Sequence, residues 1–343
     1  MEHLDKLMAA YNSAPAEYQT TRYWEKNHQL LVNEIKKADL TQFRNGSYPL
    51  FGTFGFTETI YHYHHSVPKY KKWLLSLIRK LFITNRSILP YSININNIRD
   101  IAYRNCLFLG ELNNAVSIEN LEVCTYGKPN DLFTINGKAY TMQFLGFYIR
   151  YCFAQKHIKF SGNEILIELG SGSGHQVEIL KKAYPNLTVL CFDLPAPLYL
   201  CEHYLTQALG AANIVSSEKT LEMKNLDNLE KGKVYMFSSW QFPLLKNFKA
   251  DVFWNAASFG EMEPEIVKNY LSSVLGNVNW IYLLQAQKGK ESHNTSGVVK
   301  PTTFYDYDNM LKGYTLKETH DAYQAHRRMA ETGGYFEAIW QKE

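Results

Sequence analysis

The second half of the chain alternates short apolar runs with amphipathic segments. The apolar runs are EILIEL (164–169), TVLCFDL, DVFWNAA and VNWIYLLQA, and the segments between them, such as HQVEILKKAY and EPEIVKNYLSSVLG, carry the spacing of helices that are apolar on one face. Another such segment, PLYLCEHYLTQALG, ends at Gly210, a residue that commonly closes helices. Alternation of this kind predicts an α/β domain with a parallel sheet and helices on both of its faces.

The first part of the chain has a different pattern. From Met1 to about Gly137, short apolar patches are broken by Gly and Pro, and strands and helices do not alternate. We therefore predict a mostly helical accessory domain over residues 1–137, on the substrate side, followed by the α/β domain over 138–343. Tyr140–Ile158 is apolar nearly all round, which predicts a buried helix that joins the two parts.

Two further points of the pattern concern the edges of the sheet. Tyr314–Thr319 and Tyr335–Trp340 read as a hairpin-like pair of strands at the end of the sheet. Between Ala211 and Lys233 the pattern is ambiguous, because either NIVSS or KVYMFSS suits the third strand. We favour the second.

Composition and charge limit the classes of function. The formal net charge of +3 is too small for the basic field of a typical duplex-binding surface, so nucleic acid is not an expected partner. The chain has five cysteines without a C-x-x-C pair, which indicates reduced thiols rather than disulfides or a zinc site. It has neither a signal-peptide core nor an apolar run long enough for a membrane span. We expect a cytoplasmic protein without stable membrane insertion, and a homodimer stays open.

The segment ELGSGSG (168–174) directly follows the first predicted strand and opens a helix. Its three glycines let the backbone turn tightly and let a ligand approach the amides of Gly170, Ser171, Gly172 and Gly174. In a parallel sheet, ligands bind at the carboxyl ends of the strands. Asp193 ends the second strand, where a carboxylate can reach ribose hydroxyls.

The residues around this loop discriminate between nucleotide ligands. A dinucleotide motif G-x-G-x-x-G would need glycine where His175 stands, and no G-K-S or G-K-T follows for a P-loop. Glu168 would repel a pyrophosphate but attract the ammonium group of a methionine moiety. Acid, glycine loop and second acid together favour S-adenosylmethionine as the cofactor. The alternative without a ligand is that the glycines form an ordinary tight turn between strand and helix and that Asp193 is a helix cap.

From Tyr126 to the C-terminus the chain resembles the sugar O-methyltransferase family, within the Rossmann-like methyltransferases. The resemblance is carried by YGKPNDLFTINGKAYT, ELGSGSG, CFDLP, the run Ser258–Met262, YLLQAQK and GGYFEAIW. It implies a Rossmann-like methyltransferase sheet and a sugar or glycoside as substrate. By similarity to small-molecule O-methyltransferases, it also implies that the nucleoside is lined by Asp193 and Leu194 and then by Met236 and Phe237. Such proteins often have another glycine where this chain has His175.

Removing a proton from an acceptor hydroxyl requires a positioned base. The candidates are Glu261, His175 and His293; Glu261 follows the fourth strand at the acceptor edge of the sheet, where it is equally suited to start a helix. Asn255, at the end of that strand, is a further candidate for contact with the cofactor. Because this strand does not end in clustered carboxylates, we expect no metal.

Two other segments allow more than one interpretation. His62, His64 and His65 lie in YHYHH without a ligand partner at suitable spacing, so we assign them no metal. Tyr70–Ile83 has the apolar face of a membrane-surface helix or of a helix packed on the core, and we prefer the second. Two rival functions also remain: an NAD-dependent oxidoreductase, and a non-catalytic protein with a methyltransferase fold.

Overall fold

The computed structural model describes residues 2–53, 55–56, 95–288, 298–322 and 334–343. The predictions for His62, His64, His65, residues 70–83 and His293 fall outside these residues. At the centre lies an eight-stranded sheet, whose strands in spatial order are β5 (Ile214–Val215), β6 (Val234–Ser238), β4 (Thr188–Asp193), β3 (Ile165–Leu169), β7 (Ala250–Ala256), β8 (Val278–Ala286), β10 (Tyr335–Lys342) and β9 (Tyr314–Asp321).

All neighbouring strands of this sheet are parallel except those that pair with β10, which runs antiparallel to both β8 and β9. The chain begins in the middle with β3, proceeds outward through β4 to β6, and returns to add β7 and β8 on the other side. The order of strands therefore reverses between β3 and β7, and a crevice for ligands is expected at such a switch point. This topology confirms the predicted Rossmann-like sheet.

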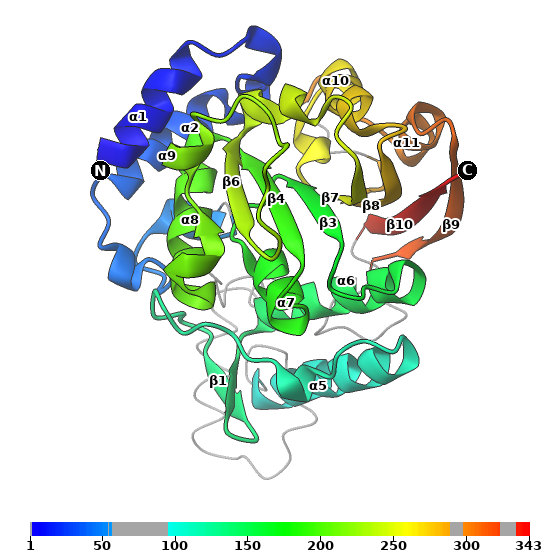
Figure 1. The fold of residues 1–343 in the computed structure, drawn as a ribbon. Helices are drawn as coiled ribbons and strands as arrows, with labels where there is room; N and C mark the ends of the chain where they lie inside the picture. Colours follow the sequence, from blue (N-terminus) through cyan, green and yellow to red (C-terminus); the bar gives the residue numbers. More distant parts are fainter. Residues whose placement is uncertain (1, 54, 57–94, 289–297, 323–333) are drawn as a thin grey trace.

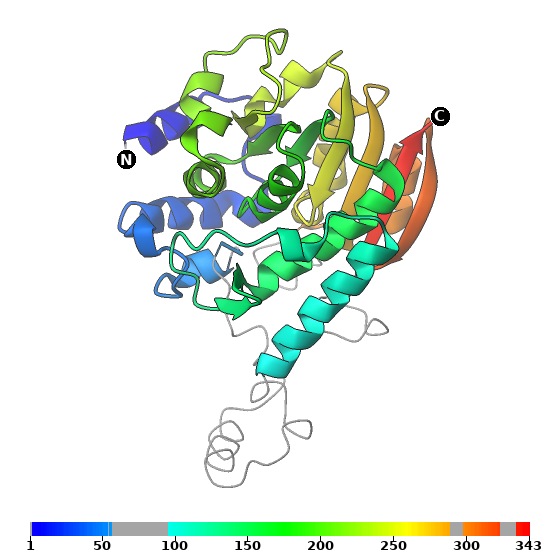
Figure 2. The same cartoon turned by 60° about the horizontal axis from the view of Figure 1, so that its bottom comes forward.

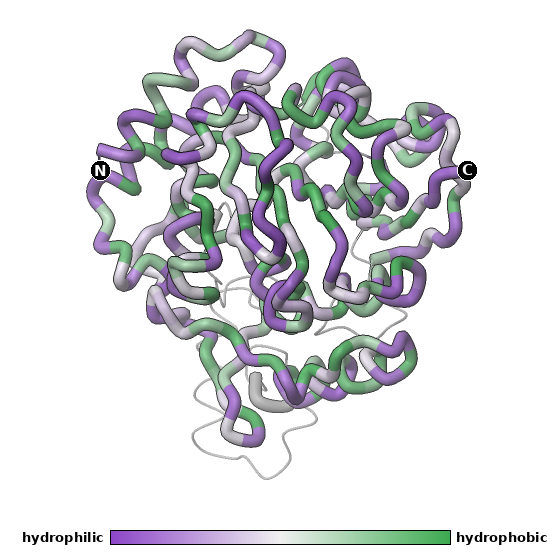
Figure 3. Tube along the Cα trace, in the orientation of Figure 1, coloured by the Kyte–Doolittle hydropathy of each residue, from purple (hydrophilic) through white to green (hydrophobic). Residues whose placement is uncertain are grey.

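Helices cover both faces of the sheet (Figure 1). On one face, α6 (Met142–Ile158), α7 (His175–Ala183) and α8 (Pro195–Leu209) pack around Leu166, Val189 and Val252. The other face carries η8 (Ser239–Leu245), α10 (Pro264–Val274) and α11 (Phe304–Met310) around Ile167, Leu190 and Phe253. Side chains alternate between the faces along each strand, and Figure 3 shows the hydrophobic stretches in the strands and in the helices that pack on them.

The N-terminal residues that the structure describes are mostly helical. Their helices are α1 (Glu2–Asn12), η1 (Ala16–Tyr18), α2 (Arg22–Ile35), η2 (Leu40–Gln42), α3 (Pro49–Thr53), α5 (Ile95–Leu112) and η6 (Ile118–Asn120), followed by a small hairpin of β1 (Phe133–Ile135) and β2 (Lys138–Tyr140). Helices α1 and α2 contact α8, and α5 lies along α6, as Figure 2 shows from below. Leu4 and Leu31 belong to the same apolar core as Leu166 of β3.

Most predicted elements agree with the structure. The long helix α6, the strand–helix alternation and the C-terminal hairpin of β9 and β10 are confirmed. Gly210 follows α8 with φ of 86°, which is unfavourable for other residues. In the ambiguous region both segments form strands: KVYMFSS gives β6, and NIVSS gives the two-residue β5 at the edge, after η7 (Ala211–Asn213) and before α9 (Ser217–Thr220).

Among the helices of the described ranges, none has the length and apolar character needed to cross a membrane.

Candidate active site

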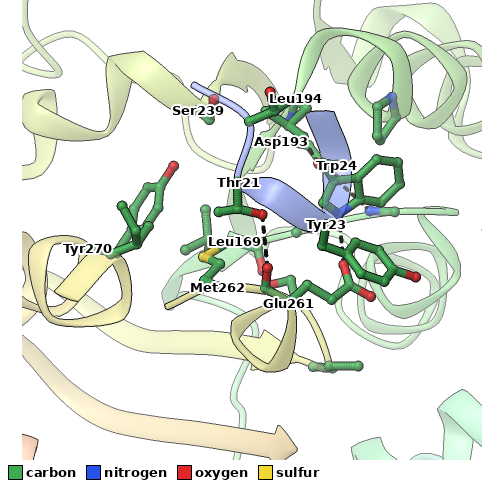
Figure 4. A pocket seen from close by; sticks show the side chains of 18 of the residues that line it. Thr21, Tyr23, Trp24, Leu169, Asp193, Leu194, Ser239, Glu261, Met262 and Tyr270 are labelled. Carbon is green, nitrogen blue, oxygen red and sulfur yellow. Dashed lines mark hydrogen bonds between the residues drawn. The ribbon is translucent and has the colours of Figure 1, made fainter. Parts of the chain in front are cut away.

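A cavity of about 340 Å³ lies at the carboxyl ends of β3, β4 and β7, at the switch point of the sheet (Figure 4). This volume is within the range of small-molecule sites. Its lining comes from five parts of the chain: the glycine loop and the end of β4, the start of η8, the segment from β7 to α10, the N-terminal segment 19–24, and residues 55–56. The lining residues used below are Thr21, Trp24, Gly170, Gly172, Asp193, Leu194, Ser239, Ala257, Ser258, Glu261 and Tyr270.

The glycine loop is closely packed on both sides. Gly170 has φ of 78°, and a Cβ added there would lie 2.5 Å from the side chain of Ser258. Gly174, with φ of 76°, is the N-cap residue directly before α7, and a Cβ there would lie 3.0 Å from Leu205 Cγ. Since these positions allow neither a side chain nor an ordinary backbone conformation, the loop requires glycine. Gly170 and Gly172 line the cavity, whereas Ser171 and Gly174 are buried behind it.

Asp193 lies at the end of β4 and lines the cavity together with Leu194. Its Oδ2 accepts a hydrogen bond of 2.8 Å from the amide of Gly172, and its Oδ1 accepts one of 2.8 Å from the amide of Leu194. Burial raises the pKa of Asp193 to about 7, against the effect of these two bonds. Each carboxylate oxygen has a second lone pair, so Asp193 can still accept hydrogen bonds from ligand hydroxyls.

Glu168 points to the other face of the sheet from Leu169, toward α6. It is buried, and its Oε2 has no hydrogen-bond partner. The pKa of Glu168 is raised to about 8, mainly by burial and in part by the charge of nearby Asp193. A buried polar atom without a partner is costly and calls for an explanation, such as a ligand that supplies the partner. Glu168 lies beside the loop rather than among the residues that line the cavity.

Asn255 is at the end of β7 and is fully buried. Its Nδ2 donates to the carbonyl of Leu169 at 2.9 Å and to Ser258 Oγ at 2.6 Å, and its Oδ1 accepts from Gln285 Nε2 at 2.6 Å. The structure therefore places Asn255 behind the cavity wall, where it ties the end of β7 to the end of β3. Ala257 and Ser258, which follow shortly after Asn255, line the cavity. Ala257 has φ of 72°, a strained backbone conformation that is frequent at functional sites.

Met236 and Phe237 do not line the cavity, in contrast to what the resemblance implied. Both are fully buried inside β6, and the ring of Phe237 stacks on Phe192 of β4 with centroids 5.0 Å apart. The strand continues to Ser238, so the first residue of this segment at the cavity is Ser239. An apolar run indicates a strand but does not show at which residue its carboxyl end lies.

Glu261 ends η9 (Phe259–Glu261), after β7, and lines the cavity. This confirms its expected location at the carboxyl edge of the sheet. Two N-terminal side chains hold it: Thr21 Oγ1 donates to the Glu261 carbonyl at 2.9 Å, and Trp24 Nε1 donates to Glu261 Oε2 at 2.8 Å (Figure 4). The indole bond fixes the carboxylate toward α2.

His175 is placed away from the cavity. Its side chain is buried between the rings of Phe147 and Tyr204, and its Nε2 lies 3.0 Å from Arg44 Nη2. Because arginine only donates, Nε2 accepts, and the ring proton is on Nδ1, which donates to Ser173 Oγ at 2.7 Å. Burial, with the charge of Arg44, lowers the pKa of His175 well below its ordinary value. This environment favours a packing role for His175 over that of a base.

The N-terminal wall of the cavity was not foreseen from the sequence. Gln19, Thr20, Thr21, Tyr23 and Trp24 line it, and Ser239 Oγ donates to the carbonyl of Tyr18 at 3.1 Å. None of these residues forms a recognisable motif. Within the ranges that the structure describes, no group of three or more His, Cys, Asp or Glu side chains is arranged to hold a metal ion.

The sheet order and the glycine loop define a Rossmann-like α/β protein with a ligand site at its switch point. No family model matches the chain, and no curated protein matches it in sequence. Among solved structures it is similar to an S-adenosylmethionine-dependent methyltransferase from Aquifex aeolicus, with 14% identity and a TM-score of 0.36 over 55% of this chain and 86% of that one.

Two further similar structures are magnesium protoporphyrin IX methyltransferase from Synechocystis PCC 6803 and the mitomycin 7-O-methyltransferase MmcR. The first has 11% identity and a TM-score of 0.39 over 59% of this chain and 83% of that one. The second has 9% identity and a TM-score of 0.38 over 99% of this chain and 72% of that one.

Proposed function

We propose that this protein is an S-adenosylmethionine-dependent O-methyltransferase that methylates a hydroxyl group of a sugar or a sugar-containing small molecule. One observation carries the proposal: a glycine loop flanked by Glu168 and Asp193 meets a cavity that has a further carboxylate, Glu261, on its opposite side. The N-terminal segment, which supplies the wall beside Glu261, acts as an accessory domain on the substrate side.

The residues of the loop suit this cofactor better than a dinucleotide. Asp193 would hold the ribose hydroxyls, and the unpartnered Oε2 of Glu168 suits a cationic ammonium group, whereas a pyrophosphate would be repelled by it. Gly170 and Gly172 leave room for a ligand against the backbone, and Leu194, Ser239 and Tyr270 complete the wall. When bound, S-adenosylmethionine supplies a methyl group on a sulfonium, ready for direct displacement.

The protein's own residues then have three tasks. They must bring the acceptor oxygen into line at about 3 Å, exclude water, and remove the proton of the hydroxyl. Glu261 Oε1 or Oε2 takes that proton, while the indole of Trp24 keeps the carboxylate in place. The segment 19–24 covers this side of the cavity and keeps water from the reacting atoms.

The sugar acceptor is supported by the family resemblance and by the aromatic side chains of Tyr23 and Trp24 at the cavity. Aromatic faces suit the apolar side of a sugar ring, and a carboxylate beside them can accept hydrogen bonds from its hydroxyls. A substrate of this kind would be bound without a metal ion.

The test uses S-adenosylmethionine with an isotopically labelled methyl group and a panel of free sugars, nucleotide sugars and glycosides. Transfer of label to an acceptor, located on an oxygen by mass spectrometry, is the expected result. Label on nitrogen or carbon would contradict the O-methyltransferase proposal. Tight binding of S-adenosylhomocysteine without transfer to any acceptor of the panel would support the non-catalytic alternative.

A further inference from the structure

One face of helix α2 contacts two separate parts of the molecule. Trp24 and His28 are four residues apart on this helix, so their side chains lie on the same side of it. Trp24 donates to Glu261 beside the cavity, whereas His28, one turn further along, contacts the start of α8. Helix α2 therefore joins the segment after β7 to the helix that follows β4.

His28 accepts a hydrogen bond from the backbone amide of Ala196, with 3.2 Å between Nε2 and the amide nitrogen. The side chain of His28 is only 3% exposed. Burial lowers the pKa of His28 to about 4, so the ring is neutral near pH 7. A neutral imidazole has one nitrogen that accepts and one that donates, so Nε2 is the acceptor and the ring proton is on Nδ1.

The amide of Ala196 belongs to the first turn of α8, where backbone N–H groups have no partner within the helix. A side chain at the N-cap position commonly accepts from one of these groups, but the N-cap residue here is Leu194, whose side chain makes no such bond. Pro195, the next residue, has no N–H. His28 thus caps α8 from another helix, at a point where Leu194 and Pro197 line the cavity.

These contacts link the candidate base to the cofactor side of the cavity. Glu261 is held by Trp24, His28 follows on the same face of α2, and Ala196 lies three residues after Asp193. Figure 4 shows Trp24, Glu261 and Asp193 around the one cavity. Because four residues of a helix rise only about 6 Å, a shift of α2 at His28 moves Trp24 as well. The position of the Glu261 carboxylate relative to Asp193 therefore depends on how α2 is seated on α8.

Tyr11 of α1 supports the same contact. Its ring meets the imidazole of His28 edge-on, with centroids 5.3 Å apart, and lies 5.7 Å from the ring of Trp240 in η8. Its hydroxyl accepts a hydrogen bond of 2.6 Å from the amide of Thr20, which lines the cavity. His28 is thus packed from a second side by a residue that also holds the N-terminal wall.

We propose that His28 is a positioning residue for methyl transfer: its bond to the Ala196 amide seats α2 on α8 and so keeps Trp24, and with it the Glu261 carboxylate, in place beside the cofactor. The inference rests on the proposed function. It assigns His28 no contact with cofactor or acceptor, because His28 does not line the cavity. A displacement of about 1 Å at the reacting groups is enough to slow a reaction that requires an in-line approach.

The experiment compares three substitutions of His28. The side-chain oxygen of Gln can accept from Ala196 at about the distance of Nε2, Asn is shorter by one methylene, and Leu has no acceptor. We expect the turnover number, measured with the acceptor that the labelling panel identifies, to fall about fivefold in His28→Leu and His28→Asn, as for one lost hydrogen bond. His28→Gln should lose less than about twofold. Affinity for S-adenosylhomocysteine, measured by calorimetry, should stay nearly constant in all three, because the sheet holds Asp193 and the glycine loop.

A second readout needs no acceptor. The indole N–H signal of Trp24 in nuclear magnetic resonance spectra, identified by its loss in Trp24→Phe, reports the bond to Glu261. This signal should shift in His28→Leu and return in His28→Gln. The matched control is His203→Leu: His203 is a half-buried residue of α8 whose Nε2 lies 2.8 Å from the hydroxyl of Tyr126, so its loss should change neither the signal nor turnover.

A double variant tests whether His28 acts through Trp24. If it does, adding His28→Leu to Trp24→Phe should cost less than the product of the two separate losses in turnover, since the contact that His28 positions is already absent. Losses that multiply would show that the two residues act independently. Thermal unfolding shows which variants are folded, and should His28→Leu fail to fold, the comparison of His28→Gln with His28→Asn decides.

Three outcomes would overturn the role of His28 and leave the proposed function intact: equal turnover in the Gln and Asn variants, an unmoved indole signal in His28→Leu, or independent losses in the double variant. A loss of cofactor affinity as large as the loss of turnover would assign His28 to the cofactor side and also overturn it. If the wild-type protein transfers no methyl group to any acceptor, the proposed function fails and the role in methyl transfer falls with it. The indole signal would still show whether His28 seats α2.

Discussion

The two walls of the cavity differ in how the chain builds them. The first wall, formed by Gly170, Gly172, Asp193 and Leu194, comes from adjacent parallel strands and the turns that follow them. The second wall brings Trp24 onto Glu261, two residues 237 positions apart in sequence. The first wall is thus a consequence of the sheet itself, whereas the second depends on how the N-terminal helices dock on it.

This difference suggests a division of tasks. Backbone amides and a strand-end carboxylate, held by the sheet, suit a cofactor that never changes. A wall supplied by a separate segment suits the acceptor, because that segment can vary without disturbing the cofactor loop. Substitutions in the first wall should therefore alter cofactor affinity, and those in the second should alter turnover.

The largest effect is expected for Glu261→Gln. If Glu261 removes the hydroxyl proton, the variant should lower the turnover number by about a hundredfold or more while S-adenosylhomocysteine binds normally. Unfolding and single-turnover measurements on the same variant provide the check. A variant that keeps full turnover and loses no more than about 1 kcal/mol of stability would identify Glu261 as a helix-start acid and leave His293 as a candidate.

Asp193→Ala should weaken S-adenosylhomocysteine binding by about 1.5 to 3 kcal/mol, the loss expected for hydrogen bonds to a charged group. The variant should still fold. The backbone amides of Gly172 and Leu194, which donate hydrogen bonds to Asp193, can bind water instead because this position is half-buried. Calorimetry gives the dissociation constant directly. An unchanged value would remove Asp193 from the ribose site.

The affinity for S-adenosylhomocysteine should depend on pH through Glu168. Its pKa of about 8 means that it is mostly protonated near neutrality, while an ammonium group binds its ionised form. Binding should thus lower the pKa of Glu168 and release a proton, and affinity should rise, by about tenfold for one unit of displacement, as pH increases from 6 to 8.

The release of a proton when S-adenosylhomocysteine binds is measured from the dependence of the binding enthalpy on the ionisation enthalpy of the buffer. Glu168→Gln should reduce it, and the release that remains comes from Asp193, whose pKa of about 7 lies in the same range. Proton uptake on binding, or an affinity that is flat across this pH range in the wild type, would contradict the pairing of Glu168 with the ammonium group.

The raised pKa of Glu168 also affects the ligand-free protein. Since the folded state holds this proton at pH values where the unfolded chain has lost it, stability should decrease as pH rises from about 4.5 through about 8. Glu168→Gln should flatten this part of the stability profile, which denaturant unfolding at several pH values can measure. An identical profile in the variant would assign the pH dependence to other groups.

The smallest effect is expected for Trp24→Phe, which keeps an aromatic ring but removes the donor to Glu261 Oε2. The turnover number should fall by about twofold to tenfold, as for the loss of one hydrogen bond, without a change in cofactor affinity. Steady-state rates measure the turnover number, and calorimetry measures the cofactor affinity. If cofactor affinity fell as much as turnover, the N-terminal wall would not be specific to the acceptor.

The first wall of the cavity could be predicted from the sequence, whereas the second could not. Apolar runs ended by Gly or Asp located β3 and β4, so the first wall could be foreseen, including Gly170 and Asp193. The favoured run KVYMFSS includes all of β6, but the resemblance assigned the nucleoside to Met236 and Phe237, which are buried inside this strand, and the structure brings Ser239 to the cavity instead. The residue at which a strand reaches the cavity depends on the neighbouring strands and loops, so it cannot be determined from the local sequence pattern.

Long-range packing explains the other differences. His175 was a candidate for the base, but Arg44, far away in the sequence, donates to its Nε2, and the side chain is buried inside the core. The position of Trp24 depends on the docking of α2 against α8, and α2 has no motif that indicates a partner. Glu168 was identified as a cofactor residue, yet only the structure shows that it lies buried beside Trp254 of β7 and that its Oε2 has no hydrogen-bond partner.

The most direct test of the account is the ligand preference of the purified protein in thermal unfolding. A ligand that binds only the folded state raises the melting temperature, and at a hundred times its dissociation constant it contributes about 2.7 kcal/mol. We predict that S-adenosylhomocysteine raises the melting temperature by several degrees and that NAD leaves it unchanged. Stabilisation by NAD, with no response to S-adenosylhomocysteine, would contradict the assignment of the glycine loop and with it the proposed function.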